Sequence, residues 1–355
     1  MKKHKISFCT TCMNRLTHIK ETFKKNILDN ADYDNVEFLL LDYNSSDGLQ
    51  DYVKTELGEF ILTKKLSYFR TEDPIRYNMS HSRNLAFKLA NGEILCNVDS
   101  DNFTGPGFAT YINEMFVKND KIYLSTHGDS SIKNDVLGRI CVKKDDFLNV
   151  NGYDESMLHY GFDDFDFSNR LQMNGLSKKT ISDQKFLNAI SHSNAVRIQN
   201  FEIARLEKLL INHITPAESI LLFLFADGKF KQGTIISNYN YNALSNTVGG
   251  KKNLTFRYSL SEDGWIEGIW GEKDNMILLT VNKKELSLTQ AGDNWLIYNN
   301  SIKYRDSQST VLKDEMLFFL HQISNRMIME KNLSGRIIKV NEGKFGLGTV
   351  STKLN

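Results

Sequence analysis

Apolar residues in the first part of the chain follow two alternating patterns. Short apolar runs, which predict buried strands, occupy residues 5–11, 36–41, 66–70 and 94–98. Between them, apolar residues three or four positions apart predict helices at residues 17–28, 50–57 and 79–90. Strands that alternate with helices are typical of a mostly parallel sheet with helices on both faces. We therefore expect an α/β domain.

The pattern changes after residue 200. Before that point, strands are predicted at residues 123–126 and 138–142, and short helices at residues 144–149 and 168–173. After it, helices are predicted at residues 201–213 and 313–331, with strands at residues 220–225, 233–237, 253–260, 265–271, 276–282 and 295–299. Short strands at this spacing indicate a small antiparallel sheet or barrel. We divide the chain into the α/β domain (1–200), an accessory module of helix, antiparallel strands and helix (201–335), and a glycine-rich tail (336–355).

The stretch ILCNVDSDN, residues 94–102, joins a predicted buried strand to two carboxylates, Asp99 and Asp101. Open α/β sheets bind ligands at the carboxyl ends of their strands, and Thr10 and Asp42 also stand at predicted strand ends. Neighbouring carboxylates repel each other, and a divalent cation is the usual means of holding them together. The alternative is a surface turn, for which Asp-Ser-Asp-Asn is also suited. Taken with the strand ends, the stretch favours a nucleotide-binding domain with a metal ion.

The two common phosphate-binding loops are absent from the sequence. No GxGxxG follows the first predicted strand, and no GxxxxGK[ST] occurs anywhere in the chain. This argues against dehydrogenases, kinases and ATPases. A metal ion held by Asp99 and Asp101 is the simplest remaining way to bind phosphates.

A second acidic cluster, HYGFDDFDF, occupies residues 159–167. Its Asp163, Asp164 and Asp166 stand near a predicted helix start, where the helix dipole favours acidic residues of any function. Alternatively, carboxylates crowded among aromatic side chains have the raised pKa of a general base. His192 follows in ISHSN and is either a structural histidine or a ligand.

Composition sets few further limits. The chain has 355 residues, 44 basic and 43 acidic, so its net charge of +1 gives no reason to expect nucleic acid as a partner. Cys9 and Cys12 form a CTTC without a second CxxC, which favours reduced structural thiols over a zinc or redox site. The N-terminus lacks the apolar segment of a signal peptide, and the longest apolar run, residues 220–226, is too short to span a bilayer. We expect a cytoplasmic protein, and peripheral contact with the inner face of the membrane stays open.

Five segments in this order resemble the GT-A glycosyltransferases, in particular the inverting family 2 and family 7 enzymes with a galactosyltransferase-type second half. They are ISFCTTCMNR, LLLDYNSSDG, SHSRNLAFKLANGEILCNVDSDN, NGYDESMLHYGFDDFDFSNRL and ISHSN. The resemblance implies the Rossmann-like, mostly parallel sheet of nucleotide-diphospho-sugar transferases. It also implies a UDP-sugar donor whose diphosphate is bridged by Mn²⁺ or Mg²⁺.

Carried over by position, the resemblance assigns roles to individual residues. Asp101 and His192 match the metal ligands, and Asp164 matches the catalytic base. Asp163 matches an acceptor-binding acidic residue, beside which we place Tyr160. The donor nucleotide is assigned to Thr10, Asn14, Arg15, Asp42, Arg83 and Asp99, with Asp42 at the uracil ring and Asp99 near the ribose. The family usually has GWGxED where this chain has GFDDFDF, which leaves the acceptor and its placement open.

The expected function is metal-dependent, inverting transfer of a hexosyl or N-acetylhexosaminyl group from a UDP-sugar to a glycan or glycoconjugate, as in surface polysaccharide synthesis. The alternatives are a catalytically silent nucleotide- or glycan-binding protein on this scaffold, and a nucleotidyltransferase, whose basic triphosphate loop we do not find. Trp265, Trp270 and Trp295 form either a sugar-stacking platform or part of a core. The tail at residues 343–350 resembles one that closes over the donor site in some relatives, or it is a disordered end.

Overall fold

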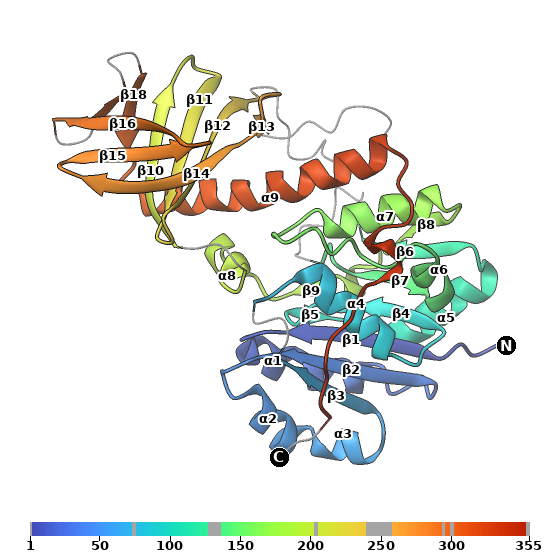
Figure 1. The fold of residues 1–355 in the computed structure, drawn as a ribbon. Coiled ribbons are helices and arrows are strands. Elements are labelled where there is room, and N and C mark those ends of the chain that lie inside the picture. Colours follow the sequence, from blue (N-terminus) through green and yellow to red (C-terminus); the bar gives the residue numbers. More distant parts are fainter. Residues whose placement is uncertain are drawn as a thin grey trace. The chain divides into compact units, whose positions relative to one another are not determined.

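A computed structural model describes residues 2–72, 76–126, 136–201, 205–238, 258–292, 295–298 and 302–352. The chain divides into two compact units, which we describe separately. The first is built mainly from residues 1–202 and 324–355, and the second mainly from residues 203–246 and 251–323 (Figure 1).

The first unit contains a seven-stranded sheet in the order β3-β2-β1-β4-β7-β6-β8. Its strands are β1 (Ile6–Cys12), β2 (Val36–Tyr43), β3 (Leu66–Thr71), β4 (Ile94–Asn97), β6 (Ile122–Ser125), β7 (Ile140–Lys143) and β8 (Ser177–Thr180). All neighbours are parallel except at β7, which is antiparallel to both β4 and β6. The predicted mostly parallel sheet is therefore confirmed.

Helices cover both faces of this sheet because its strands are apolar on both sides. Along β1, Phe8 belongs to one core and Cys9 to the other. The first core takes residues from α1 (Leu16–Asp29) and α5 (Phe108–Lys118), and the second from α4 (Met79–Leu89), α6 (Lys144–Asn149) and α7 (Asp163–Met173). The unit also contains α2 (Leu49–Glu56), α3 (Gly58–Leu62), α8 (Asn194–Ile198), the 3-10 turns Gln184–Phe186 and Asn341–Gly343, and a two-stranded sheet of β5 (Asn102–Phe103) and β9 (Asn188–Ala189).

The second unit is an antiparallel barrel. Its strands are β10 (Leu206–His213), β11 (Glu218–Phe225), β12 (Lys229–Ser237), β13 (Tyr258–Leu260), β14 (Ile266–Lys273), β15 (Met276–Val281), β16 (Lys284–Ala291), β17 (Trp295–Tyr298) and β18 (Ile302–Asp306). The sheet closes because β11 pairs with both β10 and β12, while β13 extends β12. Leu210 and Leu222 lie in one core of the unit, whereas Leu209 and Leu221 join a second core with Leu320 of α9 (Thr310–Ser334).

The predicted helix at residues 201–213 is wrong. Residues 206–213 form strand β10, and residues 202–204 lie outside the described residues. Leu209 and Ile211 face the core that contains α9, and Leu210 faces the other core. A strand with both faces buried carries consecutive apolar residues, which a helical spacing also fits.

Most other predicted elements of the second unit are present. The predicted helix at residues 313–331 is α9, and five predicted strands coincide with β11, β12, β14, β15 and β17. Of the predicted strand at residues 253–260, only β13 is described, and residues 253–257 lie outside the described residues. Strands β16 and β18 were not predicted, because polar residues such as those of KELSLTQA interrupt their apolar pattern.

Two of the three tryptophans favour the core interpretation. Trp265 packs edge-to-face on Phe223 at 6.0 Å between ring centroids and joins the core with α9. Trp270 packs against the other core and donates from Nε1 to the carbonyl oxygen of Phe225 at 2.8 Å. The side chain of Trp295 lies outside the described side chains.

The C-terminal tail packs on the first unit along α4 and ends beside β3 (Figure 1). Phe345 is 5% exposed and contacts Phe147, with 5.6 Å between ring centroids. Lys88 donates to the carbonyl oxygen of Phe345 at 2.7 Å, and Ser351 forms an antiparallel bridge with Arg70. The tail is therefore part of the first unit's packing.

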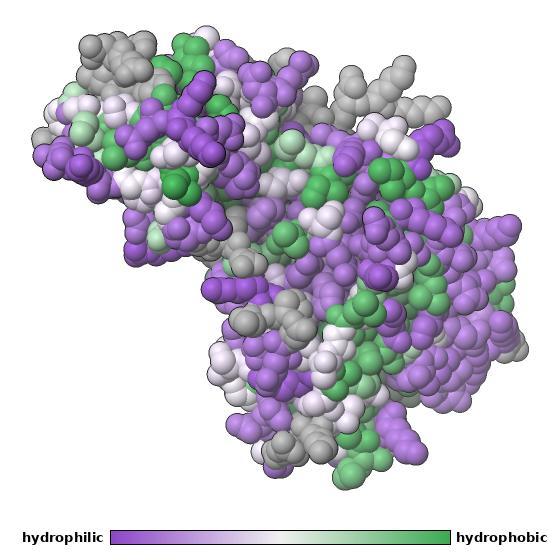
Figure 2. All heavy atoms as spheres, in the orientation of Figure 1, coloured by the Kyte–Doolittle hydropathy of each residue, from purple (hydrophilic) through white to green (hydrophobic). Residues whose placement is uncertain are grey.

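Three further features concern the surface of the first unit, the hydrophobicity of the helices and the state of the cysteines. The face of the first unit in view in Figure 2 is mostly hydrophilic, with hydrophobic residues between the polar ones. Among the described residues, no helix combines the length and hydrophobicity needed to cross a membrane. All four cysteines are buried free thiols.

Candidate active site

The polar residues predicted to bind a ligand gather where β1, β2 and β4 end. The strand registers set Cys12 beside Asp42 and Cys9 beside Asn97, so the following loops share one edge of the sheet. Asn14 adopts a φ of 53°, a conformation that asparagine tolerates better than most residues. Its Oδ1 accepts from the Ser46 amide at 2.8 Å, which ties the loop after β1 to the loop after β2.

Asp42 is fully buried and already hydrogen-bonded within the protein. Its Oδ2 accepts from Tyr68 Oη at 2.7 Å and from Arg70 Nη1 at 2.6 Å, and its Oδ1 accepts from the Ser45 amide at 2.7 Å. These contacts fix the loop after β2, and the predicted contact with uracil stays a prediction. Thr10 is 3% exposed within β1.

Arg15 connects the loop after β1 to the segment around α8. Its Nη2 donates to the carbonyl oxygen of Val196, and Asn200 Nδ2 donates to the carbonyl oxygen of Met13 at 2.7 Å. Burial lowers the pKa of Arg15, while the nearby negative charge of Asp101 opposes that shift. Arg15 therefore lies close to Asp101, one of the two predicted metal ligands.

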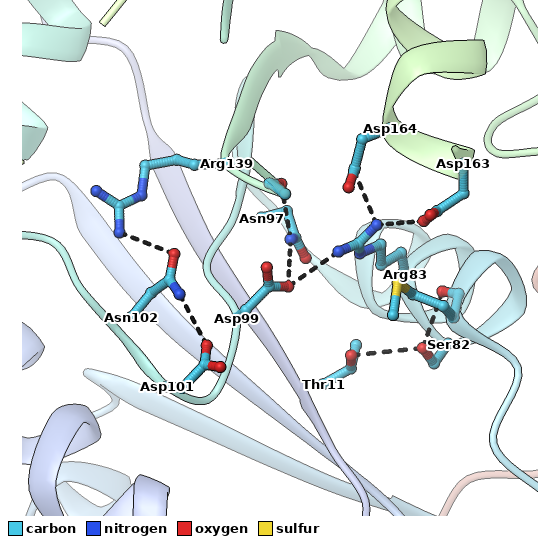
Figure 3. A network of polar contacts seen from close by, with 12 residues as sticks. Thr11, Ser82, Arg83, Asn97, Asp99, Asp101, Asn102, Arg139, Asp163 and Asp164 are labelled. Carbon is cyan, nitrogen blue, oxygen red and sulfur yellow. Dashed lines mark hydrogen bonds and ion pairs between the residues drawn. The ribbon is translucent and has the colours of Figure 1, made fainter. Parts of the chain in front are cut away.

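Arg83 joins the two acidic clusters that the sequence predicted (Figure 3). It lies on α4 and is 2% exposed. Its Nη2 donates to Asp99 Oδ1 at 3.0 Å, and its Nη1 donates to Asp164 Oδ1 at 2.8 Å and to Asp163 Oδ2. Asn97 Nδ2 also donates to Asp99 Oδ1, at 2.9 Å. Asp99, 16 positions from Arg83 in the sequence, and Asp164, 81 positions from it, therefore bind the same guanidinium.

Gly138 provides the space that this arrangement needs. A Cβ atom at this position would overlap Asp99 Oδ2 and approach Arg83 Nη2. A larger residue would therefore separate the ion pair between Arg83 and Asp99.

The three carboxylates differ in how readily they ionise. Burial raises the pKa of Asp164 well above its ordinary value, and Asp163 and Asp99 add to this while Arg83 opposes it. Burial also raises the pKa of Asp163. For Asp99 burial acts in the same direction, but Arg83 and Asn97 lower the pKa below its ordinary value. Asp164 is thus the carboxylate of the cluster best suited to hold a proton.

The end of α9 holds the segment that carries Asp164. Asn325 is fully buried, and its Nδ2 donates to the carbonyl oxygens of His159 and Gly161, both at 2.7 Å. Asn332 Nδ2 donates to Asp154 Oδ2 at 2.8 Å and to Asp166 Oδ1 at 2.9 Å. Asn325 therefore fixes the loop before α7, and Asn332 fixes the first turn of α7.

Asp101 and His192 are in direct contact although 91 residues separate them. His192 Nε2 lies 2.6 Å from Asp101 Oδ2, and both side chains are 13% exposed. The short sheet of β5 and β9 brings them together, because Asn102 pairs with Ala189 and the Ile190 amide donates to the Asp101 carbonyl oxygen at 2.8 Å.

Comparison with known families identifies the larger part of this unit. Residues 7–145 match the family model described as glycosyl transferase family 2. Residues 126–207 match the model described as N-terminal domain of galactosyltransferase. These matches confirm the predicted resemblance, and they support glycosyl transfer as the class of activity.

Solved glycosyltransferase structures are similar to part of the chain. The mannosyltransferase PcManGT from Pyrobaculum calidifontis, in complex with GDP-Man and Mn²⁺, has 19% identity and a TM-score of 0.43 over 52% of this chain and 56% of its own. S. aureus TarS 1-349 has 17% identity and a TM-score of 0.42 over 50% of this chain and 58% of its own. Its complex with UDP gives 17% identity and a TM-score of 0.44 over 56% and 67%. This chain thus spans less than two thirds of the first two structures, and no curated protein matches it.

The pair of Asp101 and His192 fits the metal that family 2 glycosyltransferases imply. Carboxylate oxygen and imidazole nitrogen are both ligands that Mn²⁺ accepts, and the two atoms already face each other. Within the described ranges, no third His, Cys, Asp or Glu joins them in a group that could hold a metal ion.

On the acceptor side, Tyr160 and Asp163 lie in different environments. Tyr160 is partly exposed, and its Oη accepts from Arg197 Nη1 at 3.2 Å. The side chain of Asp163 is 2% exposed and that of Asp164 is 13% exposed. Asp164 is therefore the more accessible of the two neighbouring carboxylates.

Two residues that lie beside the predicted site, His18 and Arg139, were not singled out from the sequence. His18 lies in the first turn of α1, with its ring edge-to-face to that of His192 at 5.7 Å between centroids, and burial lowers its pKa. The available signal in the sequence was its place in the first turn of the helix that follows β1. Arg139 is fully buried before β7 and reaches Asn102, and RICV gave no signal beyond an apolar strand.

Proposed function

We propose that this protein transfers a sugar from a UDP-sugar to a hydroxyl group of a glycan or glycoconjugate, in a metal-dependent reaction that inverts the anomeric configuration. The observation that carries the proposal is the position of Arg83. It bonds Asp99, which the family places near the donor ribose, and Asp164, which the family places as the base. Donor-side and acceptor-side carboxylates therefore lie on opposite sides of one side chain.

On the donor side, the proposal assigns the nucleotide to the edge of the sheet where β1, β2 and β4 end, together with α4. The residues are Thr10, Asn14, Arg15, Asp42, Arg83 and Asp99. Asp101 and His192 would hold Mn²⁺ or Mg²⁺. When bound, the divalent ion neutralises charge on the leaving diphosphate.

On the acceptor side, Asp164 acts as the general base. The acceptor oxygen attacks C1 of the donor sugar while its proton passes to Asp164, and the bond from C1 to the diphosphate oxygen breaks. Attack on the face opposite the diphosphate inverts the configuration at C1. Arg83 favours the ionised form of Asp164 that this step requires, against the effect of burial.

Tyr160 and Asp163 belong to the acceptor site in this proposal. Because Asp163 is almost fully buried, we expect Tyr160 to contact the sugar directly and Asp163 to act through Arg83. The acceptor is proposed to be part of a surface polysaccharide made on the cytoplasmic side of the membrane. This last assignment follows from the family resemblance alone.

A thermal-shift panel of nucleotides and UDP-sugars, with and without Mn²⁺, tests the donor and the metal together. A ligand at about 100 times its Kd adds about 2.7 kcal/mol to the free energy of unfolding. We expect UDP with Mn²⁺ to raise the Tm of the wild type and to leave the Tm of Asp101→Ala unchanged. The absence of a shift with every nucleotide would contradict the enzymatic proposal and favour the silent binding scaffold.

A further inference from the structure

Arg139 is a buried cation that contacts neutral acceptors. It is fully buried, and its guanidinium donates to the carbonyl oxygen of Phe186, to that of Phe103 at 2.9 Å and to Asn102 Oδ1 at 3.2 Å. These contacts include no carboxylate. Burying a charge without a counter-charge is costly, so a guanidinium in this position needs a further reason.

Two carboxylates of the DSD sequence lie close enough to Arg139 to interact with its charge. Burial lowers the pKa of Arg139, whereas Cys96 and Cys141 and, to a smaller extent, Asp99 and Asp101 raise it. Asp99 is already paired with Arg83. Asp101, in contrast, contacts only Asn102 and His192 by the side-chain hydrogen bonds that the structure describes.

Asn102 connects Arg139 to Asp101 (Figure 3). It is fully buried, its Oδ1 accepts from Arg139 Nη2, and its Nδ2 donates to Asp101 Oδ1 at 2.7 Å. A carboxamide has one accepting and one donating end, so the donor on Arg139 fixes which end faces Asp101. Asp101 Oδ1 is thereby held, and Oδ2 is the oxygen directed at His192.

We propose that Arg139 and Asn102 are positioning residues for the metal-binding carboxylate of Asp101. Arg139 orients the amide of Asn102, and this amide fixes the rotation of Asp101 so that Oδ2 and His192 Nε2 face the cation together. The inference rests on the proposed function, because it requires that Asp101 binds a divalent cation. Loss of such outer partners typically weakens metal binding roughly 10- to 100-fold.

The test measures binding of Mn²⁺ alone to the intact chain, from the electron paramagnetic resonance signal of the free ion. Asn102→Leu keeps the size of the side chain and removes the hydrogen bonds to Arg139 and Asp101. We expect it to weaken Mn²⁺ binding by roughly 10-fold or more. Arg139→Met should weaken binding in the same direction, and Arg139→Lys, which retains the charge and a donor, should lose less.

Asn26 provides the matched control. Its Nδ2 donates to the backbone carbonyl oxygen of Asn102 at 2.9 Å, and its Oδ1 accepts from the Thr104 amide at 2.8 Å. Asn26→Ala therefore loosens the same loop without removing a contact of the Asp101 side chain. We expect its Mn²⁺ affinity to equal that of the wild type. Equal losses in Asn26→Ala and Asn102→Leu would show a general effect of loop stability and overturn the inference.

The Asp101→Ala variant distinguishes a failure of this inference from a failure of the proposed function. If Asp101→Ala abolishes Mn²⁺ binding while Asn102→Leu and Arg139→Met bind like the wild type, the positioning role is wrong and the metal site stands. If Asp101→Ala binds Mn²⁺ as tightly as the wild type, the metal site itself is wrong. Circular dichroism verifies that each variant is folded, and Asn102→Ser replaces Asn102→Leu in the titration if the latter does not fold.

Discussion

Arg83 is the residue at which the two halves of the proposed site meet. Its guanidinium contacts Asp99, Asp163 and Asp164, so one positive charge faces three carboxyl groups. Because burial and the neighbouring carboxylates outweigh Arg83, the pKa of Asp164 is raised. A base in this environment accepts a proton more readily than an exposed aspartate does.

The pH dependence of activity follows from this arrangement. Asp164 has to be ionised to act as a base, and its raised pKa displaces the acid limb of kcat/KM to higher pH. Asp163→Asn removes a negative neighbour that contributes to this shift, so the acid limb should move to lower pH. Asp145→Asn, on the exposed side of α6, is the control and should leave the profile in place. An acid limb that stays in place in Asp163→Asn would argue against Asp164 as the titrating base.

The contribution of Asp164 to folding stability should fall as the pH rises, whereas the activity that depends on its ionised form should rise. A carboxyl group whose pKa is raised in the folded state binds protons more tightly there than in the unfolded chain. Its contribution to stability is therefore present at low pH and is lost as the pH rises through the folded-state pKa. Asp164→Asn should raise the Tm at neutral pH, and this gain should shrink toward pH values below the ordinary aspartate pKa. A gain that is independent of pH would contradict the raised pKa.

The resemblance indicated some contacts of the site, and others could not be predicted from the sequence. The resemblance placed Asp101 and His192 in one metal site, and the structure brings them to 2.6 Å. The bond between Arg83 and Asp164 links residues 81 positions apart, and no local pattern encodes such a contact. Arg139 was missed because a charged residue beside an apolar strand is usually exposed.

At the scale of elements, periodicity led to no wrong assignment in the first unit and to one in the second. The elements predicted for the α/β sheet are present, but helix α5 and strand β8 were not predicted, and the sequence of β8, SKKT, has no apolar run. Strand β10 was taken for a helix because both of its faces are buried. Closure of the barrel depends on pairing between β10 and β18, whose registered residues, such as Ile211 and Arg305, are far apart in the sequence.

The tail provides an element-scale prediction with an internal control. Phe345 is 5% exposed in the core of the first unit, whereas Leu347 on the same tail is 62% exposed. Phe345→Ala should lower the free energy of unfolding by about 3 kcal/mol or more, because it leaves a cavity next to Phe147. Leu347→Ala should change it by about 0.5 kcal/mol at most. Urea denaturation measures both, and equal effects would mean that the tail does not pack as described.

At the scale of the whole molecule, the first unit is discontinuous in sequence. Residues 324–355 contribute Asn325, Asn332 and Phe345 to it, after the chain has formed the barrel. Composition and strand pattern predicted where the β-rich segment lies. The return of the last residues to the first unit depends on individual long-range contacts, and the sign of it in the sequence was the resemblance of residues 343–350 to a tail that closes over the donor site in some relatives.

A truncated chain tests this organisation. A fragment that ends at residue 202 lacks the asparagines that hold the loop before α7 and the phenylalanine that fills the core beside α6. We expect the fragment to be insoluble or to melt without a cooperative transition. Differential scanning calorimetry against the full chain measures this, and a cooperative transition at the wild-type Tm would show that residues 324–355 are dispensable.

The most direct test of the central claim is release of UDP from a panel of UDP-sugars in the presence of Mn²⁺, with water as the acceptor. The wild type should release UDP from at least one donor, and chelation of the metal should stop the release. Asp164→Asn should release it roughly 10²- to 10⁴-fold more slowly, the usual contribution of a general base, while binding UDP as tightly as the wild type. No release from any donor, or equal rates in the wild type and Asp164→Asn, would contradict glycosyl transfer with Asp164 as the base.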